Sequence, residues 1–565
     1  MNLSVRAGLS GVAAAAAALG VAEIVAVGTG PLSAPLLAVG GVVVDTVPGP
    51  VKDFGIAVFG VHDKTALITG TAVLLLGYAW VVGVVAVRSW RVALGGIALF
   101  GLIGATAAVT RHGAGVFAAL PSLVGAAVAV PVLRYLLGLA RAASPAPVAE
   151  PSATPGAPSA VPGAPSAVPA EPSAVPGELG ATVPVRVRDA EGAAGGSGGV
   201  AGPGAPDDSY DQDQSRRRFL KALGVVAGLS VVGGVAGRLL TGRRAVTAAR
   251  AAVALPAPRS PVPAVPADAQ ATGAVSYVTS NDDFYRIDTA LYPPQVDPAP
   301  WQLRIHGMVR NEITLTWEQL LRRPMIARYV TLACVSNEVG GDLIGNALWL
   351  GTPIKALLDE ADPLPDADQV VQRSVDGWTC GTPTAVLRDG RDALLAVGMN
   401  GAPLPIEHGF PVRMVVPGLY GYVSACKWIT EIELTRFADF DAYWVPRGWS
   451  ARGPIKTQSR IDTPRDGAER PAGPVMVAGV AWAQHTGVAK VEVQVDGGPW
   501  AEATLAGTVS SDTWRQWSYR WDATPGQHAV RVRATDTRGN TQTSTPAPPA
   551  PDGATGWHSV TVAIE

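Results

Sequence analysis

Long apolar stretches fill the first quarter of the chain, whereas the last half consists of short alternating segments. Ala, Val, Leu and Gly dominate residues 1–142, and a transmembrane helix needs about 20 apolar residues. Four stretches meet this length, near 8–28, 66–87, 92–110 and 115–139. Charged residues and prolines interrupt the segment 35–60, so we expect a loop or a re-entrant piece there. The pattern predicts an α-helical membrane bundle of about four transmembrane helices.

Arginines flank these stretches mainly on one side. If the N terminus is cytoplasmic, the positive-inside rule is satisfied by Arg6, Arg88, Arg91, Arg134 and Arg141. Arg111 is the exception. Glu23 is the single carboxylate within the first predicted helix, and it suits either a functional role or a contact between helices.

A low-complexity linker rich in Pro, Ala and Gly follows at residues 143–214, with a composition that does not bury a core. Next, Ser215-Arg-Arg-Arg-Phe-Leu-Lys221 resembles the twin-arginine export signal S-R-R-x-F-L-K, and an apolar run continues to about Leu240. The alternative is a basic flank on an ordinary transmembrane helix. We expect 215–240 to remain as a fifth anchor, followed by a stalk at 241–274. This topology predicts a multi-pass cell-membrane protein whose C-terminal half is extracytoplasmic.

Short β-type runs mixed with short helical segments are typical of an α+β domain over residues 275–450. Strands are expected at 301–306 and 328–332, and helices at 316–321 and 352–358. Residues 455–565 contain regularly spaced alternating runs, which favour an all-β sandwich of immunoglobulin type. Within it, Val495-Asp-Gly-Gly498 is typical of a tight turn.

Charge and cysteine content narrow the function classes. The formal net charge of -2 gives no support for nucleic-acid binding. The chain has three cysteines, Cys334, Cys380 and Cys426, and contains no CxxC, CxxCH or HExxH motif. Cys380 and Cys426 can form a disulfide in an exported domain or remain buried thiols.

The candidate chemistry lies between residues 329 and 428. Cys334 ends a β-type run and begins a polar, glycine-bearing turn, and a lone thiolate is a soft metal ligand. His408-Gly-Phe-Pro-Val-Arg413 and Lys427-Trp428 follow, and basic residues beside glycine-rich turns suit a phosphate. Together with Leu395-Ala-Val-Gly-Met-Asn-Gly-Ala-Pro-Leu404, these motifs resemble the molybdopterin-binding domain of the sulfite oxidase family.

The resemblance implies a molybdenum-molybdopterin cofactor and assigns residues to it. Cys334 matches the molybdenum ligand, Asp376 a pterin-binding acid, and His408 with Arg413 the phosphate-binding pair. The other positions that match cofactor-contacting segments are Phe284, Tyr285, Arg286, Asp288, Asn337, Ala425, Cys426 and Lys427. Arg286 is the candidate for stabilising an oxyanion near the open metal position. It is therefore the second expected catalytic residue, in addition to Cys334.

By this resemblance the chain is a molybdenum-dependent oxidoreductase that transfers an oxygen atom in a two-electron reaction. It departs from sulfite oxidases where the substrate binds. Glu338 and Val339 stand where cationic residues would hold sulfite, Trp449 takes the approximate place of a tyrosine, and Arg447 is a substitute charge. A small oxyanion or an S-oxide therefore remains open as the substrate, and a sulfoxide or N-oxide reductase is the alternative reaction.

The resemblance also implies partners. These are a separate redox partner, such as a cytochrome or a quinone-linked protein, and a homodimer formed through the C-terminal domain. A different class of protein, a cofactor-free tethered binding or adhesion module, is the rival interpretation.

Overall fold

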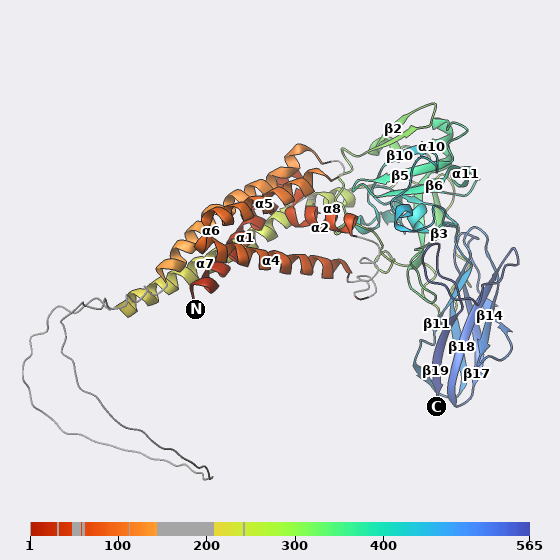
Figure 1. Ribbon diagram of the computed structural model, residues 1–565. Coiled ribbons are helices and arrows are strands. Elements are labelled where there is room, and N and C mark those ends of the chain that lie inside the picture. The colour runs from red at the N-terminus through yellow and green to blue at the C-terminus, as the bar shows by residue number, and fades with distance from the viewer. Residues whose placement is uncertain are drawn as a thin grey trace, which may run out of the picture.

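The computed structural model places an elongated helical bundle beside a mixed α+β domain, with a β-sandwich at the C-terminal end (Figure 1). The residues that the structure describes are 2–30, 33–47, 58, 63–111, 114–143, 208–240 and 243–565. Most of the predicted linker lies outside these ranges.

Five helices of the described ranges are long and apolar enough to cross a membrane. They are α1 (Leu3–Thr29), α4 (Asp63–Arg88), α5 (Trp90–Val109), α6 (Leu120–Ala142) preceded by the 3-10 turn η3 (Val116–Ala119), and α7 (Asp208–Leu240). Helices are therefore present at all four predicted stretches and at the predicted fifth anchor. Because α7 begins at Asp208, the last residues assigned to the linker are helical.

Helix α1 runs through the middle of the bundle, and glycines let its neighbours approach closely. A Cβ on Gly11 would overlap the Ala79 carbonyl oxygen of α4, and one on Gly20 would lie 2.8 Å from the Ser230 carbonyl oxygen of α7. On α6, a Cβ on Gly125 would lie 2.6 Å from the carbonyl oxygen of an alanine of α1. Small residues at such contacts are the usual means of helix association in a membrane, because apolar side chains gain little free energy by moving from lipid into a helix interface.

Residues 35–46 form a helix, α2 (Pro35–Thr46), which at 12 residues is too short to span a bilayer and leaves the re-entrant alternative open. The predicted stalk is not a free spacer, because α8 (Arg243–Ala251) and the chain after it pack on the C-terminal half. Arg250 donates hydrogen bonds to the carbonyl oxygens of Pro403 and Leu404 at 2.7 Å each. The amide of Ala271 donates to the side chain of Gln516.

Two sheets build the α+β domain. The first has the order β2-β1-β10-β5-β6, with β1 (Gln302–Gly307), β2 (Ile313–Thr316), β5 (Gln369–Ser374), β6 (Thr379–Pro383) and β10 (Ile429–Thr435). The second has the order β3-β4-β7-β8, with β3 (Ile326–Ala333), β4 (Ile344–Pro353), β7 (Leu394–Met399) and β8 (Ala402–Pro403), and β9 (Arg413–Val415) pairs with β7. The strands expected at 301–306 and 328–332 are confirmed.

Short helices connect these strands. They are α9 (Trp317–Leu321), α10 (Ile354–Ala361), α11 (Thr384–Arg388) and the 3-10 turns η4 (Ile406–His408), η5 (Gly421–Val423) and η6 (Val445–Arg447). Helix α9 begins with a capping box in which the side chains of Thr316 and Gln319 bond each other's backbone amides. Both helices predicted here are confirmed, although α10 begins at Ile354 because Thr352 still belongs to β4.

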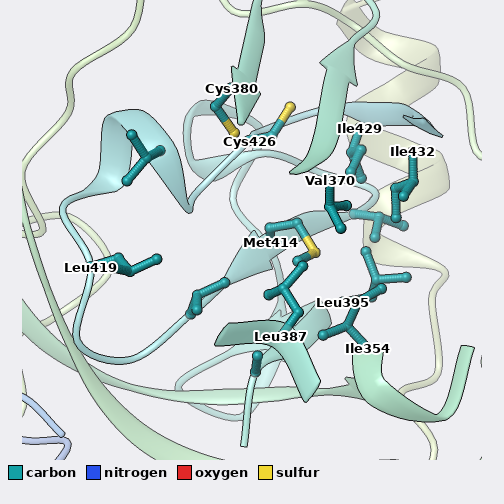
Figure 2. Close-up of a cluster of buried hydrophobic side chains, with 14 of the residues drawn as sticks. Ile354, Val370, Cys380, Leu387, Leu395, Met414, Leu419, Cys426, Ile429 and Ile432 are labelled. Atoms are coloured by element: carbon teal, nitrogen blue, oxygen red, sulfur yellow. The ribbon is translucent and has the colours of Figure 1, made fainter. Parts of the chain in front are cut away.

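Cys380 and Cys426 lie in the apolar core of this domain. Figure 2 shows their side chains next to each other, above Met414, Ile429 and Val370. Both are fully buried free thiols. Of the two alternatives for this pair, the structure therefore has the buried thiols.

The C-terminal β-sandwich consists of two sheets, as predicted. One has the order β11-β13-β17-β16, with β11 (Gln458–Thr463), β13 (Gly473–Trp482), β16 (Thr504–Leu505) and β17 (Arg515–Ala523). The other has the order β12-β19-β18-β14-β15, with β12 (Ala468–Arg470), β14 (Val488–Val495), β15 (Ala501–Glu502), β18 (Gly526–Asp536) and β19 (His558–Ile564). The predicted turn is present, with Asp496 and Gly497 both at positive φ.

Trp514 connects the sandwich to the α+β domain. It is 2% exposed and belongs to the same apolar cluster as the α+β core. Its indole N–H donates to the Tyr277 carbonyl oxygen at 2.9 Å, and its amide donates to the Thr331 hydroxyl at 2.8 Å.

Replacing Trp514 by Ala should therefore lower the free energy of unfolding by about 3–5 kcal/mol, the usual cost of removing a buried Trp. Urea unfolding of the detergent-solubilised full chain, followed by proteolytic susceptibility, measures this. The matched control is Trp500→Ala, because Trp500 is only half-buried beside Arg533 and should cost about 1 kcal/mol or less. Equal losses in the two variants would show that Trp514 does not hold the domains together.

Candidate functional site

A cavity of about 130 Å³ opens in the α+β domain where the ends of β3, β5 and β9 approach the 284–289 segment. Most of the residues assigned by resemblance line it. They are Phe284, Tyr285, Asp288, Cys334, Asp376, His408, Arg413, Ala425 and Lys427. Segments far apart in sequence thus converge on one space, since Asp288 and Lys427 are separated by 139 residues.

Cys334 follows the last residue of β3 and is 7% exposed. Its amide donates to the Leu343 carbonyl oxygen, and its own carbonyl accepts from the Asn337 amide, so the following turn folds back on the strand. Burial raises the pKa of the Cys334 thiol, and hydrogen bonds with Ser336 and the Val335 backbone partly offset this effect. A buried thiol with a raised pKa becomes a thiolate readily only when a cation such as a metal ion binds it.

Basic side chains gather in another part of the site, around Asp288 and His408. The Lys427 ammonium donates to Asp288 at 2.8 Å, and the Arg286 guanidinium donates to the same carboxylate oxygen at 3.0 Å. Arg413 is 5% exposed, donates to the carbonyl oxygens of His408 and Met414, and lies over the Trp349 ring at 4.8 Å. No carboxylate pairs with Arg413 among the described residues.

Burial and mutual repulsion lower the pKa values in this basic group. Desolvation, followed by the charges of Arg413 and Lys427, lowers the pKa of His408 to about 4. Desolvation lowers the pKa of Arg413 to about 10 and that of Lys427 to about 8, the latter although Asp288 acts in the opposite direction. A bound dianion such as a phosphate would reverse these shifts, because it supplies the negative charge that the group lacks.

Aromatic and aliphatic side chains form the rest of the wall. They are Ile287, Val335, Trp378, Tyr422, Trp444 and Trp449. Trp449 packs against Trp444 and Tyr422 with ring centroids about 6 Å apart. Glu338 and Val339 are not part of the lining, where Val335 and Ser336 stand instead. Arg447 stacks on Tyr443 at 3.7 Å and is also outside the lining, so it does not supply the substitute charge in this arrangement.

Three of the assigned residues are not part of the cavity lining. Asn337 accepts the Leu343 amide at 2.8 Å and shapes the turn after Cys334. Cys426 lies in the core beside Cys380. Arg286 pairs with Asp288 and is close enough to His408 and Lys427 to lower their pKa values, so it belongs to the basic group. The role expected for Arg286 at the open metal position stays a prediction.

Ser374 lines the cavity but was not predicted. It ends β5, is 2% exposed, and its hydroxyl has no hydrogen-bond partner among the described residues. A buried hydroxyl without a partner is costly, so its place in the wall suggests a polar ligand group. The only signal in the sequence was its position two residues before Asp376.

These residues fit a pterin cofactor that carries a phosphate and a metal. The described residues contain no cluster of three or more His, Cys, Asp or Glu side chains that would hold a metal ion alone. One thiol, a buried basic group and an unpaired hydroxyl in the same wall match a ligand that brings its own metal-binding sulfurs and its own negative charge.

Comparison with known families agrees with this assignment. The model of the oxidoreductase molybdopterin binding domain matches residues 290–444, and that of a bacterial Ig domain matches residues 458–532. An uncharacterized oxidoreductase, YuiH of Bacillus subtilis, is 31% identical over 169 residues, which cover 30% of this chain and 81% of that protein.

Two further relatives have named activities. The mitochondrial sulfite oxidase of Mus musculus is 30% identical over 321 residues, covering 48% of this chain and 58% of the mouse protein. The protein-methionine-sulfoxide reductase catalytic subunit MsrP of Gluconobacter oxydans is 32% identical over 216 residues, covering 33% of this chain and 65% of that protein. The chain thus spans little more than half the length of the sulfite oxidases that it matches.

The lowered pKa of His408 predicts a stability change in the cofactor-free protein. Between pH 6.5 and 4 the unfolded chain protonates this histidine whereas the folded chain does not, so the free energy of unfolding falls as the pH falls. A shift from 6.5 to about 4 corresponds to a loss of roughly 3 kcal/mol below pH 4. Urea unfolding at pH 7 and pH 4 should show this extra loss in the wild type relative to His408→Gln. Equal pH dependence in both proteins would contradict the prediction.

Proposed function

Because the chain belongs to the sulfite oxidase family of molybdopterin-dependent oxidoreductases, we propose that it is a membrane-anchored enzyme that transfers one oxygen atom in a two-electron reaction. The observation that carries the proposal is the convergence of Cys334 with the buried basic residues His408, Arg413 and Lys427 in one cavity. A cofactor-free binding module gains nothing from burying the charges of Arg413 and Lys427 together, since each costs free energy to desolvate.

The thiol, the basic residues and the free hydroxyl each have a role in holding the cofactor. When bound, molybdenum-molybdopterin supplies a metal centre that exchanges two electrons as an oxygen atom moves to or from the substrate. Cys334 is the protein's metal ligand, and Arg413 and Lys427 hold the phosphate. Asp288 orients Lys427 and Arg286 by accepting from both, and Ser374 donates its free hydroxyl to the cofactor.

The aromatic wall favours a neutral substrate. In this proposal the cations that line the cavity, Arg413 and Lys427, are engaged by the cofactor phosphate and are not available to a sulfite dianion. Trp378, Trp444 and Trp449 instead offer apolar surface to a larger molecule. Reduction of an S-oxide is therefore the better supported direction, in line with the likeness to a methionine-sulfoxide reductase subunit. Oxidation of a small oxyanion such as sulfite is the second candidate, supported by the likeness to sulfite oxidases.

The helical bundle supports a place in the membrane, and the arginine pattern supports an extracytoplasmic catalytic domain. Ser215–Lys221 lies in the first half of α7, where it serves as the export signal in this proposal. Pairing of two copies through the sandwich stays a prediction from the resemblance.

Replacing Cys334 by Ser should remove activity and lower the molybdenum content from about one metal per chain, because a neutral hydroxyl is a poor ligand for a soft centre. The measurement is elemental analysis of protein purified from a host that makes the cofactor. Cys380→Ser is the matched control, since Cys380 is a buried thiol outside the cavity and should leave the metal content unchanged. A wild type without molybdenum would reject the proposed function.

The substrate assignment predicts a selective effect of Trp449→Ala. Loss of an aromatic contact costs about 0.5–1.5 kcal/mol, so kcat/KM for methyl phenyl sulfoxide should fall about three- to tenfold. The value for dimethyl sulfoxide, which lacks the ring, should change less than twofold. Higher turnover of sulfite than of either sulfoxide by the wild type would favour the second candidate.

A further inference from the structure

A second cavity of about 420 Å³ lies between the helical bundle and the α+β domain. From the bundle, α2 and the C-terminal end of α5 contribute Leu37, Val42 and Arg111. The α+β domain contributes Leu291, Tyr292 and Tyr443. Thr289, Asp376 and Trp378 line this cavity and also the one that contains Cys334. The two spaces are therefore separated by the thickness of single side chains.

The second cavity lies at the end of a membrane-spanning helix. Helix α5 ends at Val109, and Thr110 and Arg111, which follow it directly, are in the wall. Figure 1 shows α2 where the bundle meets the α+β domain. The contact is close, because a Cβ on Gly40 would lie 2.7 Å from the Leu291 side chain. A molecule dissolved in the membrane would reach this space at the bilayer surface.

The lining combines apolar and hydrogen-bonding groups. Leu37, Val42 and Leu291 offer aliphatic surface, and Tyr443 and Trp378 offer aromatic rings. Arg111 brings a guanidinium, and Asp376 brings a carboxylate that can accept a proton. A molecule with a flat ring, an oxygen at each end of the ring and an apolar tail matches these lining groups. Its ring and tail need apolar contacts, and its oxygens need hydrogen-bond donors and acceptors.

We propose that this second cavity binds a membrane quinol, which gives its electrons to the neighbouring site of the same chain. The proposal rests on the proposed function and adds the electron donor to it. The balanced reaction converts one quinol and one sulfoxide into one quinone, one sulfide and one water. The quinol loses two electrons and two protons, the sulfur–oxygen bond breaks, and the oxygen leaves as water. Asp376, which faces both cavities, is placed to accept a proton from the quinol.

Photolabelling tests binding without reference to activity. The full chain in phospholipid nanodiscs is labelled with an azido-ubiquinone, and the modified peptides are mapped by mass spectrometry. Label should fall on α2 or on residues 289–294, and excess unlabelled ubiquinone should suppress it. Label that falls elsewhere, or that unlabelled ubiquinone does not suppress, overturns the proposal.

A pair of double variants tests the cavity. Leu37→Trp/Val42→Trp narrows it and should lower specific labelling at least tenfold. The matched control is Leu36→Trp/Val43→Trp, in which half-buried residues of the same types, on the same helix but outside the lining, receive the same change. The control should keep wild-type labelling. Equal labelling of the two double variants overturns the proposal.

Steady-state assays connect binding to electron transfer. The rate of sulfoxide reduction is measured with decylubiquinol and, separately, with reduced methyl viologen, a soluble donor. The ratio of the quinol rate to the viologen rate should fall at least tenfold in Leu37→Trp/Val42→Trp and remain at the wild-type value in the control. A wild type that uses viologen but not quinol contradicts the proposal and leaves the proposed function standing. A wild type that binds the quinone in the cavity but reduces no sulfoxide with viologen contradicts the proposed function instead.

Discussion

The burial of unbalanced positive charge is the constraint on which the site depends. Arg413 and Lys427 are both under 10% exposed, and Asp288 is shared between Lys427 and Arg286. Desolvating such groups costs several kcal/mol per ion, so the fold must hold them in place until an anion arrives. Gly409 makes their approach possible. At φ +111, a Cβ there would lie 3.0 Å from the Cβ of Arg413 and 3.1 Å from that of Lys427. A glycine directly after His408 is thus a steric requirement.

The sequence allowed the fold class to be predicted from local signals, and most of the cavity wall from the family resemblance. Apolar length marks the spans, alternation marks the strands, and the spacing of Cys334, His408 and Lys427 carries the resemblance. The direction in which a side chain points does not follow from such sequence signals. Arg286 donates to the carboxylate of Asp288 two residues later, a contact that the sequence alone does not reveal. Ser374 was missed because a serine that ends a strand resembles any other until its neighbours are known.

Contacts between segments that are far apart in the sequence could not be predicted from the sequence either. Residues 241–274 have the composition of a spacer, yet Arg250 and Ala271 find partners more than 150 residues away. Helix α2 contains an aspartate near its end and prolines beyond it, which suggested a loop or a re-entrant piece. Its apolar face packs against α5, Gly40 lies against Leu291 of the α+β domain, and Gly41 lies against Arg111 just after α5. Tertiary packing supplied in both cases the stabilisation that local propensity lacks.

The turn between β5 and β6 shows how one short segment can serve two cavities. Gly377, at φ +89, reverses the chain, and its amide donates to the Ser374 carbonyl oxygen. The Val375 amide donates to the carbonyl oxygen of Trp428, which holds a left-handed conformation at φ 51 that costs about 1–3 kcal/mol. Such strain persists only where the surroundings over-determine it, and the indole N–H of Trp428 is fixed on the Ile406 carbonyl oxygen. A wall anchored in this way keeps Asp376 and Trp378 in place between the two cavities, so that whatever occupies one lies at a defined separation from the other.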